Sequence, residues 1–158
     1  MKLWRLVRAQ HQGLDGAGAL RHGARYTSPG LPVVNFASEA GLAVLIALRY
    51  LPGRNDPELA AIDQDYLLGW IEVDGVAERL PFTADADCMR SSANEWLISC
   101  RSLLAAVSSA VLPEADVVMM NPCHPHATTI PRLVTRPFSF ADCLHRPPML
   151  DIYRGEPQ

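Results

Sequence analysis

Apolar residues occur in short runs along the chain, and glycines, prolines and polar residues separate these runs. Runs rich in Val, Ile, Leu and aromatic residues are typical of strands. They predict strands over residues 3–9, 31–37, 66–73, 103–107 and 117–120. Three further stretches predict helices over residues 38–51, 57–64 and 91–101. Because strands and helices do not alternate steadily, the pattern favours an α+β fold over a doubly wound parallel sheet.

The predicted helix over residues 38–51 has signals at both ends. Ser38 is a typical N-cap residue, Glu39 is well placed in the first turn, and Pro52–Gly53 ends the helix. The free N–H groups of a helix start also suit an anion. A plain cap followed by an acidic residue is, however, the more common arrangement.

Two stretches predict irregular backbone. Gly13–Gly30 contains five glycines and predicts a long loop, and loops of this length in a compact domain are usually functional or disordered. The stretch after Pro122 predicts an irregular tail, because it is rich in proline.

Composition narrows the class of protein. The 158 residues are 49% apolar and 20% charged, which predicts one folded domain over residues 1–158. The net charge of −3 argues against direct nucleic-acid binding through overall positive charge. With no signal peptide and no apolar run near the ~20 residues of a membrane span, we expect a cytoplasmic protein without membrane contact. The four cysteines form no CxxC pair and are expected to be buried thiols and not disulfides.

Arg25 is the first candidate for chemistry. It lies near the end of the glycine-bearing stretch and could hold a phosphate or carboxylate through two parallel hydrogen bonds. Tyr26 beside it could stack on a flat ring. From the residues alone, an ordinary surface arginine is the more common arrangement.

Metal and hydrolase sites have weak support. Asn121–His126, with Cys143 and His145, is poorly spaced for zinc, so we expect no metal. Ser109, His124 and Asp142 could in principle form a Ser-His-Asp hydrolase, but the chain has no G-x-S-x-G motif. Gly16-Ala17-Gly18 lacks the third glycine of a dinucleotide-binding fingerprint.

Taken in order, the segments of nearly the whole chain resemble the RES domain family. The matching segments are Leu3-Trp4-Arg5-Leu6, Gly16-Ala17-Gly18-Ala19, Gly23–Gly30 (GARYTSPG), Pro32–Glu39 (PVVNFASE), Leu42-Ala43-Val44-Leu45, Asn94-Glu95-Trp96-Leu97, Val107–Val111 (VSSAV) and Asn121–Pro125 (NPCHP). This family contains the toxins of a bacterial type II toxin–antitoxin class.

The resemblance implies a fold and an activity. The fold would be a β core of short, mainly antiparallel strands with flanking helices, like that of ADP-ribosyltransferases. The activity would be cleavage of the nicotinamide–ribose bond of NAD+, which is a substrate here, and no metal would be needed. The implied partner is an Xre-like DNA-binding antitoxin that forms a hetero-oligomer with the toxin and blocks its cleft.

The resemblance also implies residue roles. Arg25 would hold the NAD+ diphosphate, and Ser109 would orient the ribose or nicotinamide. The catalytic residues expected on this basis are Arg25, Glu39 and Ser109. The expected NAD+-binding residues are Arg5, Arg25, Tyr26, Asn35, Ser38, Tyr50 and Ser109.

The chain departs from the family pattern where chemistry is expected. The family tyrosine falls on Asn35, the family glutamate on Ile46 and a family histidine on Tyr50. Cleavage builds positive charge on the ribose, and losing a carboxylate that stabilises such charge costs on the order of 3–4 kcal/mol. Glu39 is a replacement candidate two turns earlier on the helix, about 10 Å along its axis. Tyr26 or Tyr50 could replace the aromatic residue.

The departures leave several alternatives open. An active enzyme could degrade NAD+ with water or phosphate, or transfer ADP-ribose to a protein acceptor that supplies its own groups. Alternatively, a catalytically dead RES domain could bind the antitoxin and regulate it. An unrelated hydrolase that uses Ser109 is the weakest alternative.

Overall fold

A computed structural model describes residues 1–49 and 65–140 of the chain. These residues form one seven-stranded sheet. Its strand order is β4-β5-β6-β2-β1-β3-β7, and every neighbouring pair is antiparallel except β4–β5. The strands are β1 (Lys2–Arg8), β2 (Val34–Ala37), β3 (Tyr66–Glu72), β4 (Glu78–Arg79), β5 (Leu104–Ser108), β6 (Asp116–Met120) and β7 (Val134–Pro137). The predicted α+β fold with short, mainly antiparallel strands is therefore confirmed.

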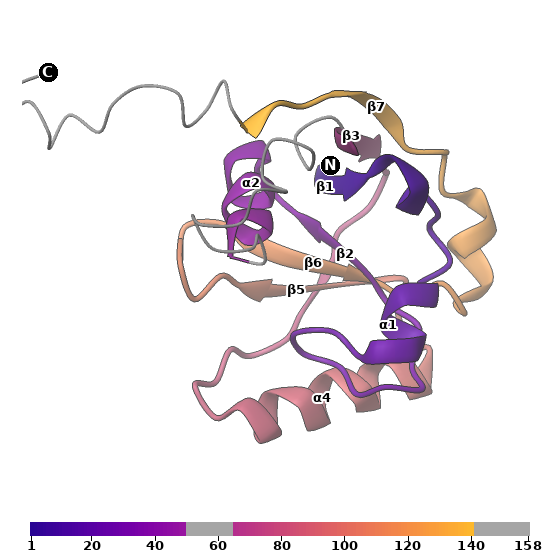
Figure 1. Cartoon of the computed structure of the whole chain (residues 1–158). Helices are drawn as coiled ribbons and strands as arrows, with labels where there is room; N and C mark the ends of the chain where they lie inside the picture. Colours follow the sequence, from indigo (N-terminus) through magenta and orange to yellow (C-terminus); the bar gives the residue numbers. More distant parts are fainter. Residues whose placement is uncertain (50–64, 141–158) are drawn as a thin grey trace, which may run out of the picture.

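Helices flank the sheet (Figure 1). The α-helices are α1 (Ala17–His22), α2 (Ala40–Leu48) and α4 (Ala86–Ser99), and the 3-10 helices include η1 (Ala9–His11) and η3 (Pro125–Thr129). Among the described residues, no helix has the length and apolar character needed to cross a membrane.

The core has two sides because side chains alternate along β5 and β6. On one side, Val107 and Met119 pack with Trp96 of α4. On the other side, Ala106 and Val118 pack with apolar residues of β1, β2 and β3. Helix α4 thus covers one face of the hairpin, as Figure 1 shows below β5.

Two helix predictions need correction. The predicted loop over 13–30 contains α1, whose first turn is stabilised by the Asp15 carboxylate accepting from the Ala17 N–H at 3.0 Å. Helix α2 begins after Glu39 and not after Ser38. The Ser38 hydroxyl instead accepts a hydrogen bond from the Asp116 backbone N–H at 2.9 Å, so it does not cap the helix.

Other boundaries also differ from the prediction. Helix α4 begins at Ala86, earlier than residue 91, because Asp85 caps it through the N–H groups of Asp87 and Cys88. Between residues 122 and 140 the predicted irregular tail instead forms η3 and β7. The rest of that tail lies outside the described residues. The short strand β4 was not expected. The expectation of buried thiols is wrong for Cys88 and Cys123, which are exposed. The predicted helix over 57–64 lies outside the described residues.

Candidate functional site

Two cavities meet beside β2, and Asn35 of β2 and Ile46 of α2 line both of them. Their volumes are about 380 and 500 Å³. We call them together the double cavity, with a β1 half and an Arg25 half. Both volumes lie within the usual range for small-molecule sites. Two of the three family positions that differ in this chain, Asn35 and Ile46, therefore lie at the junction of the double cavity.

Strand β1 forms most of the β1 half. Consecutive residues Trp4–Arg8 line this half together with His11 and Tyr66. The Trp4 and Trp70 rings lie 5.5 Å apart, and the Tyr66 ring meets Phe140 edge-on at 5.0 Å. The β1 half therefore offers aromatic side chains, which suit a flat ring.

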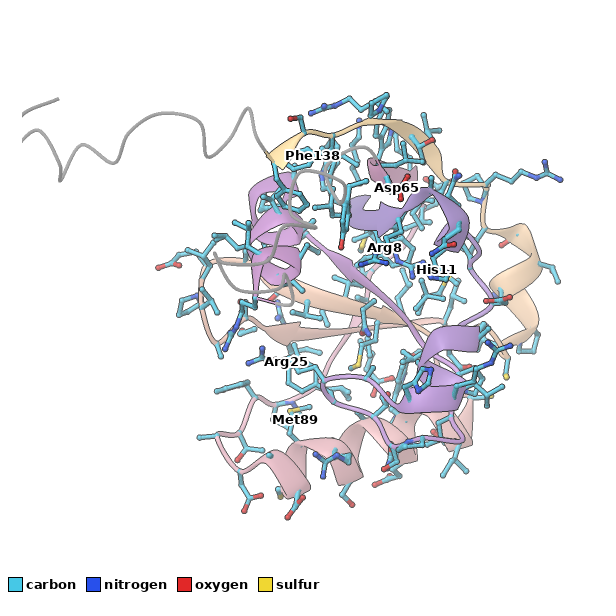
Figure 2. All side chains as sticks on the ribbon, viewed as in Figure 1. Arg8, His11, Arg25, Asp65, Met89 and Phe138 are labelled. Carbon is cyan, nitrogen blue, oxygen red and sulfur yellow. The ribbon has the colours of Figure 1, made fainter. Side chains whose placement is uncertain are left out.

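Arg25 lies in the other half, on the turn that follows α1. It is exposed, and within residues 1–49 and 65–140 it forms no ion pair. Its guanidinium carbon lies 5.5 Å from the centre of the Tyr26 ring. Figure 2 shows Arg25 well apart from Arg8 and His11, which lie together beyond β2. The cationic groups therefore surround the double cavity and do not form one cluster.

The Arg25 turn is fixed from both ends. Gly23 ends α1 with φ +73°, a conformation that L side chains rarely adopt. Ala24 and Thr27 form a bridge with backbone hydrogen bonds of 3.0 and 3.3 Å. The turn thus presents Arg25 from a well-defined backbone.

Tyr26 is 7% exposed and packs in the hydrophobic cluster with Trp96. Its hydroxyl has no hydrogen-bond partner among the described residues, and the Thr27 hydroxyl has none either. Buried hydroxyls without partners are costly and therefore uncommon in native proteins. Tyr26 lines the Arg25 half as expected, but its ring belongs to the core.

Ser109 follows β5 and lines the Arg25 half. It is 4% exposed. Its Oγ accepts from the backbone N–H groups of Val111 and Leu112 at 3.2 and 3.3 Å. Because both bonds use the oxygen as acceptor, the hydroxyl hydrogen remains available to donate to a ligand.

Two predicted site residues do not reach the double cavity. Glu39 is exposed at the start of α2, and Ser38 joins β2 to β6 through its bond with Asp116. Neither lines the double cavity. Tyr50 lies outside the described residues. The structure thus gathers Arg5, Arg25, Tyr26, Asn35 and Ser109, whose roles toward NAD+ remain predictions.

The charged residues that line the double cavity are all positive among the described residues. Four arginines line it, Arg5 and Arg8 in the β1 half and Arg25 and Arg49 in the other. Among the described residues, no carboxylate lines either half. Such a cavity suits a diphosphate, because arginine pairs with two phosphate oxygens at once.

The structure contradicts the Ser-His-Asp hydrolase alternative, because Ser109 and His124 lie far apart. Strands β5 and β6 pair from Ser108 opposite Asp116 to Leu104 opposite Met120. Ser109 therefore lies at one end of this hairpin and His124 beyond the other end, separated by roughly 13 Å of strand. Asp142 lies outside the described residues.

The segment Asn121–His126, which contains His124, was also considered as a metal site and was expected to hold no metal. Within the described part of the chain, no three His, Cys, Asp or Glu residues are grouped to hold a metal ion. His124 uses Nδ1 to accept from the His126 backbone N–H at 3.1 Å. Cys143 and His145 lie outside the described residues.

Some lining residues were not expected from the sequence. Tyr66 reaches the β1 half because β3 pairs with β1 in a register that places it opposite Arg8. Arg49 and His22 reach the Arg25 half from the ends of α2 and α1. A strand register set by tertiary contacts could not be derived from either strand alone.

Known proteins are similar to this chain in sequence. A protein named Toxin Res from Pseudomonas putida is 34% identical over 134 residues, covering 80% of this chain and 88% of its own. A protein named Prs ADP-ribosylating toxin from Sphingobium sp. (strain YBL2) is 33% identical over 125 residues, covering 74% and 77%.

The fold is similar to a chain in the crystal structure of the M. tuberculosis MbcT-MbcA toxin-antitoxin complex. The TM-score is 0.62 at 17% sequence identity, covering 85% of this chain and 83% of that chain. The family model described as RES domain matches residues 2–141. The chain therefore belongs to the RES domain family.

Proposed function

We propose that this chain is the toxin of a toxin–antitoxin pair, and that it binds NAD+ in the double cavity and cleaves the nicotinamide–ribose bond. Relatives named as toxins, one of them as an ADP-ribosylating toxin, support this proposal. The observation that supports it most is that Arg25 and Ser109 line the same half of the double cavity as Asn35 and Ile46, which form the junction. Arg25 suits the diphosphate, and Trp4 and Tyr66 of the β1 half suit a flat ring.

The bond change can be written completely. The C–N bond between ribose and nicotinamide breaks, and neutral nicotinamide leaves with the electron pair. The positive charge then develops on the ribose, and a nucleophile forms the new bond and releases a proton. Four arginines around the cavity favour the diphosphate but oppose this developing charge.

The missing carboxylate favours transfer to a protein. Free water brings no negative charge, so the double cavity alone stabilises the ribose cation poorly. An acceptor protein with an acidic side chain at its modified site could supply the charge that Ile46 does not. We therefore favour ADP-ribosyl transfer over hydrolysis of NAD+ by water.

The experiment uses NAD+ labelled in its adenylate phosphate, the purified chain and a bacterial lysate. Label on a protein band supports transfer, whereas free labelled ADP-ribose or its phosphate supports degradation. Arg25→Ala should lower both at least about tenfold, while Arg136→Ala, at an exposed arginine on β7, serves as the matched control. No labelled product of either kind would refute the proposed activity.

The partner would be an Xre-like antitoxin that covers the double cavity. The similar fold in a toxin–antitoxin complex supports such a partner. Co-expression with an Xre-like antitoxin encoded in the same genome should yield a hetero-oligomer that no longer cleaves NAD+. Recovery of the chain alone after co-purification would count against this partner.

A second candidate is a catalytically dead RES domain that binds and regulates the antitoxin. The absence of any carboxylate on the described lining of the double cavity favours it. Growth arrest on expression without the antitoxin, relieved by Arg25→Ala, would refute the dead domain. Normal growth at matched expression would support it.

A further inference from the structure

A third cavity of about 540 Å³ lies between the end of β1 and α1. It shares Arg5 and His11 with the β1 half of the double cavity, and His22 with the Arg25 half. Glycine-bearing backbone from Gly13 to Gly18 forms another wall. We call it the α1 cavity. It adjoins the double cavity but has its own lining.

The α1 cavity is polar and carries excess positive charge. Two arginines, Arg5 and Arg21, line it with two histidines, against a single described carboxylate, Asp15. This composition is typical of sites for phosphates, since arginine supplies several N–H donors to one phosphate group.

Arg5 faces the α1 cavity. Its Nη1 donates to the Gly13 carbonyl oxygen at 3.0 Å, and Gly13 belongs to the wall of this cavity. The negative charge of Asp15, in the same wall, attracts the Arg5 guanidinium and so opposes the lowering of its pKa by burial. Arg5 belongs to β1, and its guanidinium group therefore points toward residues 13–15.

Arg5 has unused donors. A guanidinium offers five N–H groups, and only the bond to Gly13 is made among the described residues. No described carboxylate lies within ion-pair distance of it. Burial lowers the pKa of Arg5, and Asp15 offsets this only in part. A partly buried cation with free donors beside a cavity is stabilised by an anionic ligand.

Asp15 narrows the ligand class. One of its oxygens, Oδ1, accepts from the Ala17 N–H, and Oδ2 has no partner among the described residues. A carboxylate oxygen repels a bare phosphate but accepts a hydrogen bond from a hydroxyl. A sugar phosphate satisfies both kinds of group, with its phosphate on the arginines and a hydroxyl on Asp15.

We propose that the α1 cavity binds a ribose phosphate moiety, with Arg5 and Arg21 on the phosphate and Asp15 on a ribose hydroxyl. The moiety has two possible sources. It is either the adenylate part of the same NAD+ molecule that enters the double cavity, or a separate nucleotide. The proposal does not rest on NAD+ cleavage, because binding is measured directly.

The test is calorimetric titration of the purified chain with AMP, with ribose 5-phosphate and with adenosine. AMP and ribose 5-phosphate should bind, and adenosine should bind at least about tenfold more weakly because it lacks the charge-assisted bonds. Arg21→Ala should weaken AMP binding about tenfold, the loss of one such bond. Arg21 is exposed on α1, so this variant should fold. Arg136→Ala should bind AMP like the unaltered chain.

Two further variants make the outcome decisive. Asp15→Asn should keep AMP binding, because an amide oxygen still accepts from a hydroxyl, whereas Asp15→Leu should weaken it. Equal AMP affinity in Arg21→Ala and the unaltered chain, or no AMP binding at all, would overturn the proposal. AMP affinity that falls in Arg25→Ala but not in Arg21→Ala would place the nucleotide in the double cavity and overturn it as well.

NAD+ titration then identifies the source. If Arg21→Ala also weakens NAD+ binding, the ribose phosphate is the adenylate part of NAD+. If NAD+ binds Arg21→Ala unchanged while AMP binding is weakened, the α1 cavity serves a separate nucleotide. Both results support a ribose phosphate site in this cavity.

Discussion

The Asn94 side chain holds Ser28 through two hydrogen bonds across 66 positions of sequence. Its Oδ1 accepts from the Ser28 backbone N–H at 3.1 Å, and its Nδ2 donates to the Ser28 hydroxyl at 2.9 Å. Asn94 belongs to α4, and Ser28 follows the turn that carries Arg25. Helix α4 therefore positions the Arg25 turn without reaching the double cavity itself.

We expect Asn94→Ala to lower the free energy of unfolding by about 1–2 kcal/mol, because two partly buried hydrogen bonds are lost. The variant should also raise KM for NAD+ more than it lowers kcat, since Arg25 would be less well placed to hold the diphosphate. Chemical denaturation and steady-state kinetics measure the two effects.

Asn94→Asp is the matched control. Its carboxylate can accept from both the Ser28 N–H and the Ser28 hydroxyl. The KM for NAD+ should therefore stay close to that of the unaltered chain. If Asn94→Ala lowers stability but leaves KM unchanged, Asn94 has a structural role only.

Ile46→Glu should accelerate cleavage of free NAD+. Ile46 is half-buried and lines both halves of the double cavity, whose described lining holds no carboxylate. A carboxylate at this junction would stabilise positive charge on the ribose by about 3 kcal/mol, or roughly 100-fold in rate. Nicotinamide release in buffer, without an acceptor protein, measures it.

Ile46→Gln is the control for that gain, because it has nearly the same shape without the charge. The explanation fails if the Glu and Gln variants release nicotinamide at the same rate.

Tyr66→Ala should raise KM for NAD+ by up to about tenfold, because stacking on an aromatic ring contributes about 0.5–1.5 kcal/mol. Tyr66 lines the β1 half, where its ring lies 5.9 Å from the Arg8 guanidinium carbon. Tyr66→Phe keeps the ring and should keep the KM. A Phe variant as impaired as the Ala variant would assign the effect to the hydroxyl.

Glu78 makes stability depend on pH at acidic values. Its Oε2 accepts from the Ser102 hydroxyl at 2.6 Å and its Oε1 from Arg101 Nε at 2.8 Å. The Ser102 bond, followed by Arg101, lowers the pKa of Glu78, and burial opposes this. A lowered folded-state pKa means that this stabilisation is complete above the unfolded-state pKa and is lost as the pH falls through the folded-state pKa.

Glu78→Gln should therefore lower the free energy of unfolding by about 1 kcal/mol at pH 7. The two proteins should converge as the pH falls below the ordinary glutamate pKa of about 4.3. Denaturation series at pH 7 and pH 3 test this, with Glu114→Gln, an exposed glutamate, as control. A deficit of equal size at both pH values would contradict the assigned cause.

Local patterns predicted β1, β2, β3, β5 and β6 because each of these strands is rich in apolar residues. Long-range contacts explain the errors in helix boundaries. Ser38 has the residue type of a cap, but Asp116, 78 positions away, uses its hydroxyl. The edge strand β7 escaped prediction because prolines usually interrupt strands, although Pro137 is tolerated at the end of an edge strand.

The candidate site was predictable only in part. Resemblance to the family pointed to Arg25 and Ser109, which the structure brings to one cavity. It could not show that Asn35 and Ile46 form the junction of two cavities, nor that Glu39 lies outside them. Both facts depend on how α2 packs against β1 and β2, which no single segment encodes.

Release of nicotinamide from NAD+ in the presence of a bacterial lysate tests the central claim most directly. The purified chain and Arg136→Ala should release nicotinamide at equal rates, and Arg25→Ala should release it at least about tenfold more slowly, because a charge-assisted pair with the diphosphate is lost. Equal release by Arg25→Ala, or no release by the unaltered chain, would contradict the account.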